Sequence, residues 1–240
     1  MNSENQVLVI DAGNTSIKFA HFTNDKLQKT QRTDFNNLER LIEDHSHNKV
    51  VISSVLSQEQ TNKITSLFKD SILIGFHSKL PIKIQYKSPA TLGMDRICNA
   101  VYTTKNVKTK FALSIDIGTC IKFDLTNSNQ EYLGGSISPG INLRYKSLND
   151  YTGKLPLINE KNHCSLVGED TESSIQSGVI NGINAEIQRL IEQYSSEYED
   201  LTFFVTGGDA QYFDLHAKNG IFADENLTLK GLYEIYKFNV

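Results

Sequence analysis

The chain has 240 residues, of which 39% are hydrophobic and 22% charged, and its formal net charge is −4. These values are ordinary for a globular enzyme and allow one large domain or two small ones. The negative charge argues against broad binding to nucleic acid or to an anionic membrane, because such binding usually needs a basic patch. No apolar run approaches the roughly 18 residues of a membrane-spanning helix.

The cysteine usage favours a reducing compartment. Cys98, Cys120 and Cys164 are widely spaced and form no Cys-x-x-Cys pair. A disulfide framework or a structural zinc site is therefore not expected, and we expect a cytoplasmic protein. The first residues lack a basic segment followed by an apolar one, so no signal peptide is predicted. His45 and His47 have no acidic or thiol partner nearby in the sequence and are not expected to bind metal.

Apolar runs and helical spacings alternate along the chain. Strands are predicted, in chain order, at 7–11, 16–22, 50–55, 71–76, 82–86, 111–117, 121–126 and 201–206. Helices are predicted to follow Asp34 and Ser57, and to cover 96–105 and 173–194. Ser57 and Gln60 have the spacing of a capping box. This alternation predicts an α/β protein whose sheets are covered by helices.

One motif occurs twice. Residues 10–19 (IDAGNTSIKF) recur, one residue shorter, as 115–123 (IDIGTCIKF). In each copy an apolar run ends in an aspartate, Asp11 or Asp116, and a glycine turn follows. Backbone amides in such a turn can approach a phosphate closely, and the carboxylate can hold a hydrated divalent cation.

The repeat predicts two similar halves, 1–110 and 111–240, with a ligand in the cleft between them. In the first copy we expect Thr15, the neighbouring amides and Lys18 to cradle nucleotide phosphates while Asp11 positions Mg²⁺. The alternative for the first copy is an ordinary β-hairpin turn. The alternative for the second copy is a duplicated turn that is now only structural.

Residues 93–96 combine a glycine with an aspartate and an arginine. Asp95 can accept a proton from a substrate hydroxyl while the guanidinium of Arg96 holds an anion. The alternative is that Asp95 only favours the start of a helix.

Three further glycine segments could border a site. Residues 134–140 are predicted to form a turn that frames a pocket or merely reverses the chain. Residues 168–171 are most simply the cap of the long helix that follows. Residues 206–210 follow a strand and precede a predicted helix, so they could approach a nucleotide, or form a tight connection with Asp209 as N-cap.

Together these motifs resemble those of the type III pantothenate kinases, which belong to the acetate and sugar kinase/Hsp70/actin superfamily. The matching segments follow the family order over nearly the whole chain: 11–18; Tyr86 with 93–96; 116–119; 134–140 with Arg144 and 155–156; 168–171; 206–210; and 226–227 through 231–232. The first loop alone indicates only the superfamily. Tyr86 seven residues before Gly93, followed by Gly-x-Asp-Arg, is much more specific.

The resemblance implies duplicated ribonuclease-H-like (actin-like ATPase) domains and ATP-dependent phosphorylation of pantothenate to 4′-phosphopantothenate, the first step of coenzyme A synthesis. The nucleotide site that it implies contains Asp11, Ala12, Gly13, Asn14, Thr15, Ser16, Ile17, Lys18 and Thr119. The pantothenate site contains Tyr86, Gly93, Met94, Asp95, Arg96 and Thr171. Asp95 is the proton acceptor, and Thr171 reaches the substrate across a homodimer interface. Mg²⁺ accompanies ATP and meets Asp11 through water, and Asp116 binds a monovalent cation, K⁺ or NH₄⁺.

One segment departs from the family pattern. Where the family commonly reads Gly-Thr-Ala-x-Thr, this chain has Gly118-Thr119-Cys120-Ile121-Lys122. An ammonium at Lys122 that points into the site could partly replace the monovalent ion, whereas one that points to solvent would change little. The sequence leaves both possibilities open. It also leaves open whether Arg96 binds the pantothenate carboxylate or the transferring phosphoryl group.

Two other functions are compatible with parts of this pattern. A superfamily kinase or phosphatase could act on another small polyol or phosphate, although Tyr86 and residues 93–96 argue against it. A regulatory relative, like the Bvg accessory factor group, could keep the fold for binding alone. Retention of Asp11, Asp95, Arg96 and Asp116 disfavours an inactive enzyme.

Overall fold

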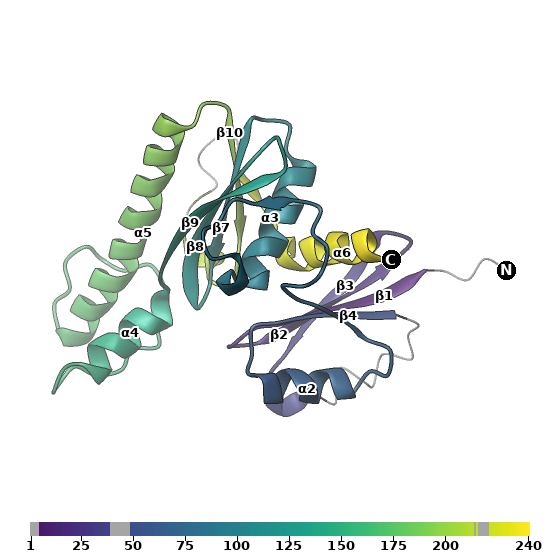
Figure 1. Ribbon diagram of the computed structural model, residues 1–240. Coiled ribbons are helices and arrows are strands. Elements are labelled where there is room, and N and C mark those ends of the chain that lie inside the picture. Colours follow the sequence, from purple (N-terminus) through teal and green to yellow (C-terminus); the bar gives the residue numbers. More distant parts are fainter. Residues whose placement is uncertain (1–4, 39–48, 214, 216–220) are drawn as a thin grey trace. The chain divides into compact units, whose positions relative to one another are not determined.

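The computed structural model describes residues 5–38, 49–213, 215 and 221–240, and the chain divides into two compact units (Figure 1). The first unit contains Met1–Asn106, Asn129–Gly134 and Asn226–Val240, and the second contains Val107–Ser128 and Gly135–Glu225. The first break lies close to residue 110, but the end of the chain returns to the first unit. The limits 1–110 and 111–240 therefore stay a proposal for the extent of the duplicated halves.

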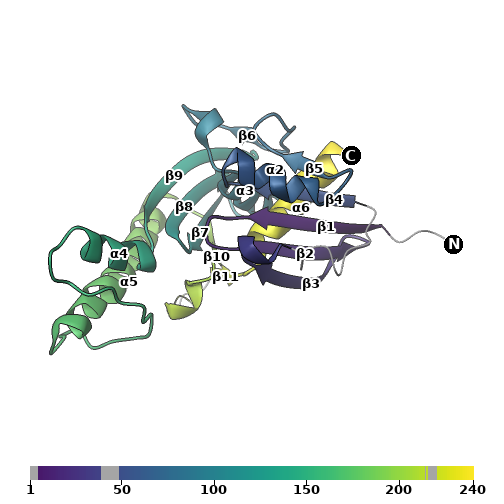
Figure 2. The same ribbon diagram turned by 90° about the horizontal axis from the view of Figure 1, so that it is seen from below.

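The first unit is built on a five-stranded sheet in the order β3-β2-β1-β4-β5 (Figure 2). Its strands are β1 (Gln6–Ala12), β2 (Ile17–Thr23), β3 (Lys26–Thr33), β4 (Lys49–Ser54) and β5 (Ile72–Ile74). The first three are antiparallel neighbours, and β4 and β5 run parallel to β1. Asn24 and Asp25, both with positive φ, form the tight turn between β2 and β3.

Helices cover both faces of this sheet, which is why β1 is apolar throughout. Val7 and Val9 belong to a core shared with α3 (Met94–Asn106) and α6 (Leu227–Asn239). Leu8 and Ile10 belong to a second core that includes Ile64 of α2 (Gln58–Ser66). A strand buried on both faces has a continuous apolar run rather than an alternating pattern.

The predicted helix starts of this unit have two outcomes. The capping box at Ser57 is confirmed, because Ser57 and Gln60 bond each other's backbone N–H groups at the start of α2. Asp34 is an N-cap as predicted, but of the short 3₁₀ helix η1 (Phe35–Asn37). Leu41 and Ile42, predicted to lie on the same helix, are outside the described residues, as are His45 and His47.

The second unit repeats this topology. Its strands are β7 (Phe111–Ile117), β8 (Cys120–Asn127), β9 (Glu131–Pro139), β10 (Leu201–Thr206) and β11 (Ile221–Ala223). They lie in the order β9-β8-β7-β10-β11, the order of β3-β2-β1-β4-β5 in the first unit. In both units the first strand is antiparallel to the second and parallel to the fourth. The same strand order and strand directions in both units confirm the predicted duplicated α/β fold.

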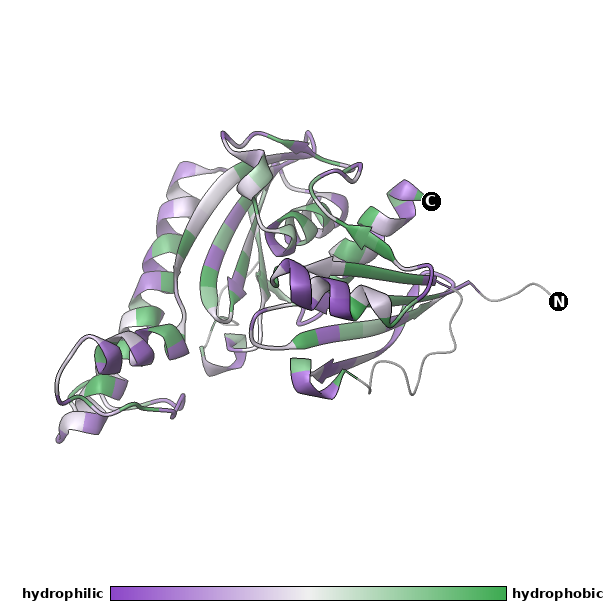
Figure 3. Ribbon diagram, turned by 60° about the horizontal axis from the view of Figure 1, so that its bottom comes forward, coloured by the Kyte–Doolittle hydropathy of each residue, from purple (hydrophilic) through white to green (hydrophobic). Residues whose placement is uncertain are grey.

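The second unit also contains α4 (Ile141–Asp150) and the long α5 (Thr171–Glu197). The buried residues of α5 recur at helical spacing: Ile175, Val179, Ile183, Ile187 and Ile191. Figure 3 shows the resulting alternation of polar and apolar residues along this helix. None of the described helices combines the length and apolar character needed to cross a membrane.

Three strands escaped prediction, each for a physical reason. Residues 134–140, predicted to form a turn, instead complete β9 and supply Gly140 as the N-cap of α4. Glycines in a strand imitate a turn signal, and Gly134 has a φ of +122°. The edge strand β3 is mostly polar (KLQKTQRT), and β11 has only three residues. A short strand, β6 (Lys83–Ile84), pairs with the start of β9.

Candidate active site

The first Asp–Gly loop joins β1 to β2 as a tight hairpin. Asp11 stands directly opposite Lys18 in the antiparallel register. The N–H of Gly13 donates to the carbonyl of Ser16 at 3.2 Å, while Asn14 and Thr15 are exposed at the tip. The hairpin alternative is therefore correct as geometry. It does not exclude phosphate binding, because the tip presents exposed backbone and a hydroxyl beside a carboxylate.

The Gly-x-Asp-Arg segment forms the start of α3. One carboxylate oxygen of Asp95 accepts a hydrogen bond from the N–H of Arg96 at 2.9 Å, which fixes the direction of the side chain. A Cβ on Gly93 would lie 2.5 Å from that same oxygen, so a larger residue would displace the carboxylate. Asp95 is partly exposed at the positive end of the helix, where an anion is favoured.

A group of three aromatic and basic side chains lies behind this helix start. Arg96 is only 4% exposed, and its guanidinium carbon lies 5.9 Å from the centre of the Tyr132 ring. Tyr86 meets the same ring edge-on at 5.9 Å. The N–H of Gln85 donates to the carbonyl of Tyr132 at 2.9 Å, which anchors the Tyr86 segment to β9. Tyr132 thus contacts both predicted substrate residues, although no sequence motif predicts it.

The charges of Asp11 and Asp95 both act on one buried thiol, that of Cys98. Burial raises the pKa of Cys98 well above its ordinary value, and the charges of Asp11 and Asp95 raise it further. Cys98 follows Asp95 by one turn of α3, so it lies on the same side of the helix. The predicted Mg²⁺ carboxylate and the predicted proton acceptor both belong to the first unit, and both charges act on this thiol.

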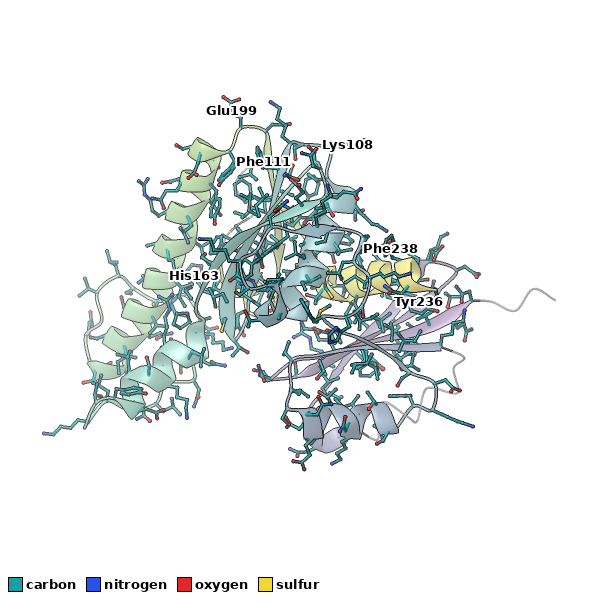
Figure 4. All side chains as sticks on the ribbon, in the orientation of Figure 1. Lys108, Phe111, His163, Glu199, Tyr236 and Phe238 are labelled. Carbon is teal, nitrogen blue, oxygen red and sulfur yellow. The ribbon has the colours of Figure 1, made fainter. Side chains whose placement is uncertain are left out.

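The helix α6 holds α3 in position, which explains the family segment near the end of the chain. A Cβ on Gly231 would lie 1.9 Å from the carbonyl oxygen of Cys98, so only glycine permits this helix contact. The hydroxyl of Thr228 donates to the side-chain oxygen of Asn99 at 2.8 Å in the buried interface. Tyr236 of α6 is buried in the same core, whereas Phe238 is exposed (Figure 4).

The second Asp–Gly loop pairs its aspartate with a lysine. Asp116 and Lys122 are opposite each other in the register of β7 and β8, and their charged atoms, Oδ2 and Nζ, lie 2.7 Å apart. The side chains are only 13% and 15% exposed, respectively. Thr119 is exposed at the tip of the turn. Lys122 therefore points to its aspartate, which decides between the two directions that the sequence left open.

Two glycines from distant segments pack against this loop. A Cβ on Gly140 would lie 2.0 Å from the carbonyl oxygen of Gly118, and the N–H of Gly140 donates to the carbonyl of Thr119 at 3.0 Å. Gly207 has a φ of +102°, and a Cβ on it would lie 2.2 Å from the carbonyl oxygen of Ile117. Glycine is required at both positions. Residues 134–140 and 206–210 thus pack against the backbone of the second loop through these two glycines.

Ion pairs within the second unit hold residues 134–140 and 206–210 in place. Asp209 is the N-cap residue of the short η3 (Ala210–Tyr212), as the alternative predicted, but its side chain makes no capping bond. It forms an ion pair with Lys161 at 2.8 Å instead. Arg144 pairs with Glu186 of α5 and donates to the carbonyl of Pro139. Lys161 and Glu186 were missed, because no local pattern reveals a partner that is distant in sequence.

The start of α5 is capped as predicted. The carboxylate of Asp170 accepts hydrogen bonds from the N–H and from the hydroxyl of Ser173, and that hydroxyl accepts one from the N–H of Asp170. The two bonds donated to the carboxylate lower the pKa of Asp170, since they favour the ionised form. Thr171 is exposed as the first residue of the helix. With Asp116 and Thr119, it places three of the predicted site residues in the second unit.

The predicted Mg²⁺ site has suitable donors without forming a metal cage. In the described part of the chain, no three His, Cys, Asp or Glu side chains gather as metal ligands. A hydrated Mg²⁺ that enters with a nucleotide needs only one or two carboxylates besides the phosphates. The carboxylate of Asp11, beside the exposed Thr15 hydroxyl, fits that requirement.

Comparison with solved structures defines the fold. A protein described as a Baf family transcriptional activator from Campylobacter jejuni matches 97% of this chain and 98% of its own at 22% identity, with a TM-score of 0.62. One described as an N-acetylmannosamine kinase from Listeria monocytogenes matches 98% of this chain and 100% of its own at 9% identity, with a TM-score of 0.53. The two units and their paired loops therefore have the fold of the actin-like ATPases and sugar kinases.

The family follows from sequence. The sequence model of the type III pantothenate kinases matches residues 7–193. A type III pantothenate kinase from Christiangramia forsetii is 43% identical over 97% of this chain and 98% of its own length. One from Cytophaga hutchinsonii is 37% identical over 97% of this chain and 99% of its own length. The chain belongs to the type III pantothenate kinase family.

Proposed function

We propose that this protein transfers the γ-phosphoryl group of ATP to the primary hydroxyl of pantothenate. The product is 4′-phosphopantothenate, and the reaction opens coenzyme A biosynthesis. The observation that carries the proposal is membership of the type III pantothenate kinase family, in a chain whose Asp95 carboxylate is oriented at the start of α3 by the N–H of Arg96. A kinase needs a carboxylate near the metal–nucleotide complex and another near the attacking hydroxyl.

Asp95 is the proposed proton acceptor. Its position at the start of α3 leaves the carboxylate partly exposed, while the N–H of Arg96 fixes its orientation. A fixed carboxylate that accepts the hydroxyl proton as the phosphoryl group arrives lowers the barrier to in-line transfer.

Arg96 is proposed to orient an anion. Its guanidinium rests on Tyr132 in a nearly buried position, where a charge interacts more strongly than at the surface. Pantothenate has both a hydroxyl and a carboxylate, which suits a proton-accepting carboxylate and a guanidinium at adjacent positions. The arginine partner is either that carboxylate or the transferring phosphoryl group, with Tyr86, Gly93 and Met94 bordering the same substrate.

The first loop is proposed to hold the nucleotide. Residues 11–18 offer backbone amides, exposed hydroxyls and Lys18 beside Asp11, and Thr119 of the second unit is proposed as a further nucleotide contact. Mg²⁺ bound with ATP would offset charge on the phosphoryl oxygens, and Asp11 would hold it through water.

We also propose a homodimer in which Thr171 reaches the pantothenate of the partner subunit. Leu166 and Val167, just before the α5 cap, are 81% and 74% exposed. Apolar side chains this exposed near a helix start support a role for this surface in association. Asp95→Asn and a disruptive Thr171 variant should then complement each other in mixed dimers. A fully active monomer in sedimentation would overturn this arrangement.

A cytoplasmic location is part of the same proposal. Cys98, Cys120 and Cys164 are free thiols, which suits a reducing compartment.

The decisive test is substrate identity. Purified protein with ATP, Mg²⁺ and K⁺ should release ADP when pantothenate is added, and mass spectrometry should detect 4′-phosphopantothenate. A library of small polyols serves as the comparison. Rapid phosphorylation of another polyol, without any phosphopantothenate, would show that the substrate is wrong.

A further inference from the structure

The ion pair between Asp116 and Lys122 is fixed by the fold of the second loop. Only Gly118 and Thr119 separate β7 from β8, and the register places Asp116 opposite Lys122. Directly opposite residues of an antiparallel pair project their side chains from the same face of the sheet. The 2.7 Å contact between Nζ and Oδ2 follows from this register.

The pair is also shielded from solvent. Asp116 and Lys122 are 13% and 15% exposed, so water and salt screen their attraction less than that of a surface pair. By contrast, the pair between Lys146 and Asp150 on α4 is 67% and 45% exposed, with its charges 3.5 Å apart. The contact at the second loop is therefore the more firmly defined of the two.

This arrangement does not fit a free monovalent cation at Asp116, which the family resemblance implies. The ammonium of Lys122 already lies at hydrogen-bond distance from the carboxylate oxygen. A K⁺ or NH₄⁺ ion on the same carboxylate would be repelled by that ammonium, since both are positive. The –NH₃⁺ group has the charge and the donor N–H groups of NH₄⁺, but it is attached to the chain.

We propose that the ammonium of Lys122 is the built-in cation of the second loop, so that phosphoryl transfer does not depend on K⁺ or NH₄⁺. This inference rests on the proposed kinase function. The ammonium offsets the charge of Asp116 three residues from Thr119, the proposed nucleotide contact. Without that cation, the carboxylate would repel the phosphates of ATP.

The test compares the wild type with Lys122→Thr, which restores the residue common in the family. ATP is supplied as its Tris salt, Mg²⁺ is constant, and ionic strength is set with K⁺, NH₄⁺, Na⁺ or tetramethylammonium chloride. The wild type should make phosphopantothenate at the same rate in all four salts. Lys122→Thr should be slow in tetramethylammonium and recover in K⁺ or NH₄⁺.

Two further variants and a binding measurement complete the design. Lys122→Arg keeps a cation and should stay independent of K⁺, whereas Lys146→Thr removes an exposed pair on α4 and should behave as wild type. K⁺ should raise the melting temperature of Lys122→Thr but not that of the wild type, because an ion that binds only the folded state stabilises it.

Two outcomes would overturn the inference. One is a wild-type rate that rises severalfold with K⁺, and the other is a folded Lys122→Thr variant that is fully active and insensitive to K⁺ in both rate and melting temperature. If Lys122→Thr does not fold, the wild type and Lys122→Arg still decide through their salt dependence. Absence of product in every salt would count against the kinase function instead, while the melting temperatures would still test the cation.

Discussion

The two Asp–Gly loops share a backbone register but differ in the charges around their aspartates. Asp11 stands opposite Lys18, as Asp116 stands opposite Lys122. In the first unit Asp11 shares its surroundings with a second carboxylate, since it and Asp95 both act on Cys98. In the second unit Asp116 is held by an ammonium. The second turn therefore joins its aspartate to a lysine, while the charge of a second carboxylate acts on the surroundings of the first.

The loops also differ in their backbone support. A Cβ on Gly13 would lie 3.1 Å from its nearest neighbour, the carbonyl oxygen of Ser16 in the same turn. A Cβ on Gly118, the counterpart of Gly13, would meet nothing within 4 Å. The second loop is instead approached by Gly140 and Gly207 from distant segments, where a Cβ would lie 2.0 and 2.2 Å from the loop backbone. We infer that the first loop is shaped for chemistry and the second for positioning, and the following substitutions test that division.

The largest effect is expected at Asp95. An amide cannot accept the hydroxyl proton, so Asp95→Asn should lower turnover about 10² to 10⁴-fold with an unchanged melting temperature. Steady-state kinetics with pantothenate measures the loss, and Asp150→Asn, at an exposed position on α4, is the matched control. Wild-type turnover in the purified Asp95 variant would remove this residue from the mechanism.

The two aspartates of the duplicated loops should respond unequally. Asp11→Asn removes a ligand that acts on Mg²⁺ through water, and changes of that kind cost about 10 to 100-fold in metal affinity or activity. Asp116→Asn should cost less, because its charge is already offset by Lys122. Mg²⁺ titrations of the rate separate the two. Equal losses, with equal shifts in Mg²⁺ dependence, would erase the proposed division.

The glycine support should matter for stability. In Gly140→Ala the new methyl meets the carbonyl of Gly118, so the free energy of unfolding should fall by about 1–3 kcal/mol, as for other overpacked sites. Gly178→Ala is the matched control on α5, where a Cβ meets nothing within 4 Å. That change should be neutral or add up to about 1 kcal/mol. Urea denaturation of both variants gives the comparison, and equal stabilities would contradict the close approach.

The smallest effect concerns helix caps. The pKa of Asp170 is lowered from its ordinary value of 3.8 because Ser173 bonds the ionised carboxylate. The resulting stabilisation of α5 is complete above that value and is lost as the pH falls through the lowered pKa in the folded state. Asp170→Asn keeps the cap but not the charge, so its melting temperature should depend less on pH in this acidic range.

The cap of α2 in the first unit provides the control for that measurement. Ser57 caps this helix without an ionisable group, so Ser57→Asn should leave the pH dependence unchanged. An identical acid response in all three proteins would show that the carboxylate of Asp170 does not contribute.

Much of this organisation could be predicted from local sequence. The strands β1, β4, β7 and β10 have continuous apolar runs because both faces of each sheet are covered, and the caps at Ser57 and Asp170 follow fixed spacings. Likewise, the repeated Asp–Gly turn predicted the duplication before the strand orders showed it.

The features that could not be predicted depend on contacts between segments that are distant in sequence, or on strand register. The direction of Lys122 is set by strand register, and a shift of one residue would have pointed it to the opposite face. Tyr132 has no motif of its own, because its role comes from meeting Tyr86 and Arg96 across segments. The tight fit of Gly231 against Cys98 likewise joins two helices that no local pattern connects.

That last contact has a consequence for synthesis on the ribosome. Thr228 and Asn99, which bond across the same helix pair, are 129 residues apart in the chain. The whole second unit is translated between α3 and α6. Nascent chains generally fold in order as they emerge, but α3 must wait for its partner helix until nearly all of these residues are made. The helix that carries Asp95 is therefore translated before most of the second unit but gains its partner helix only after that unit.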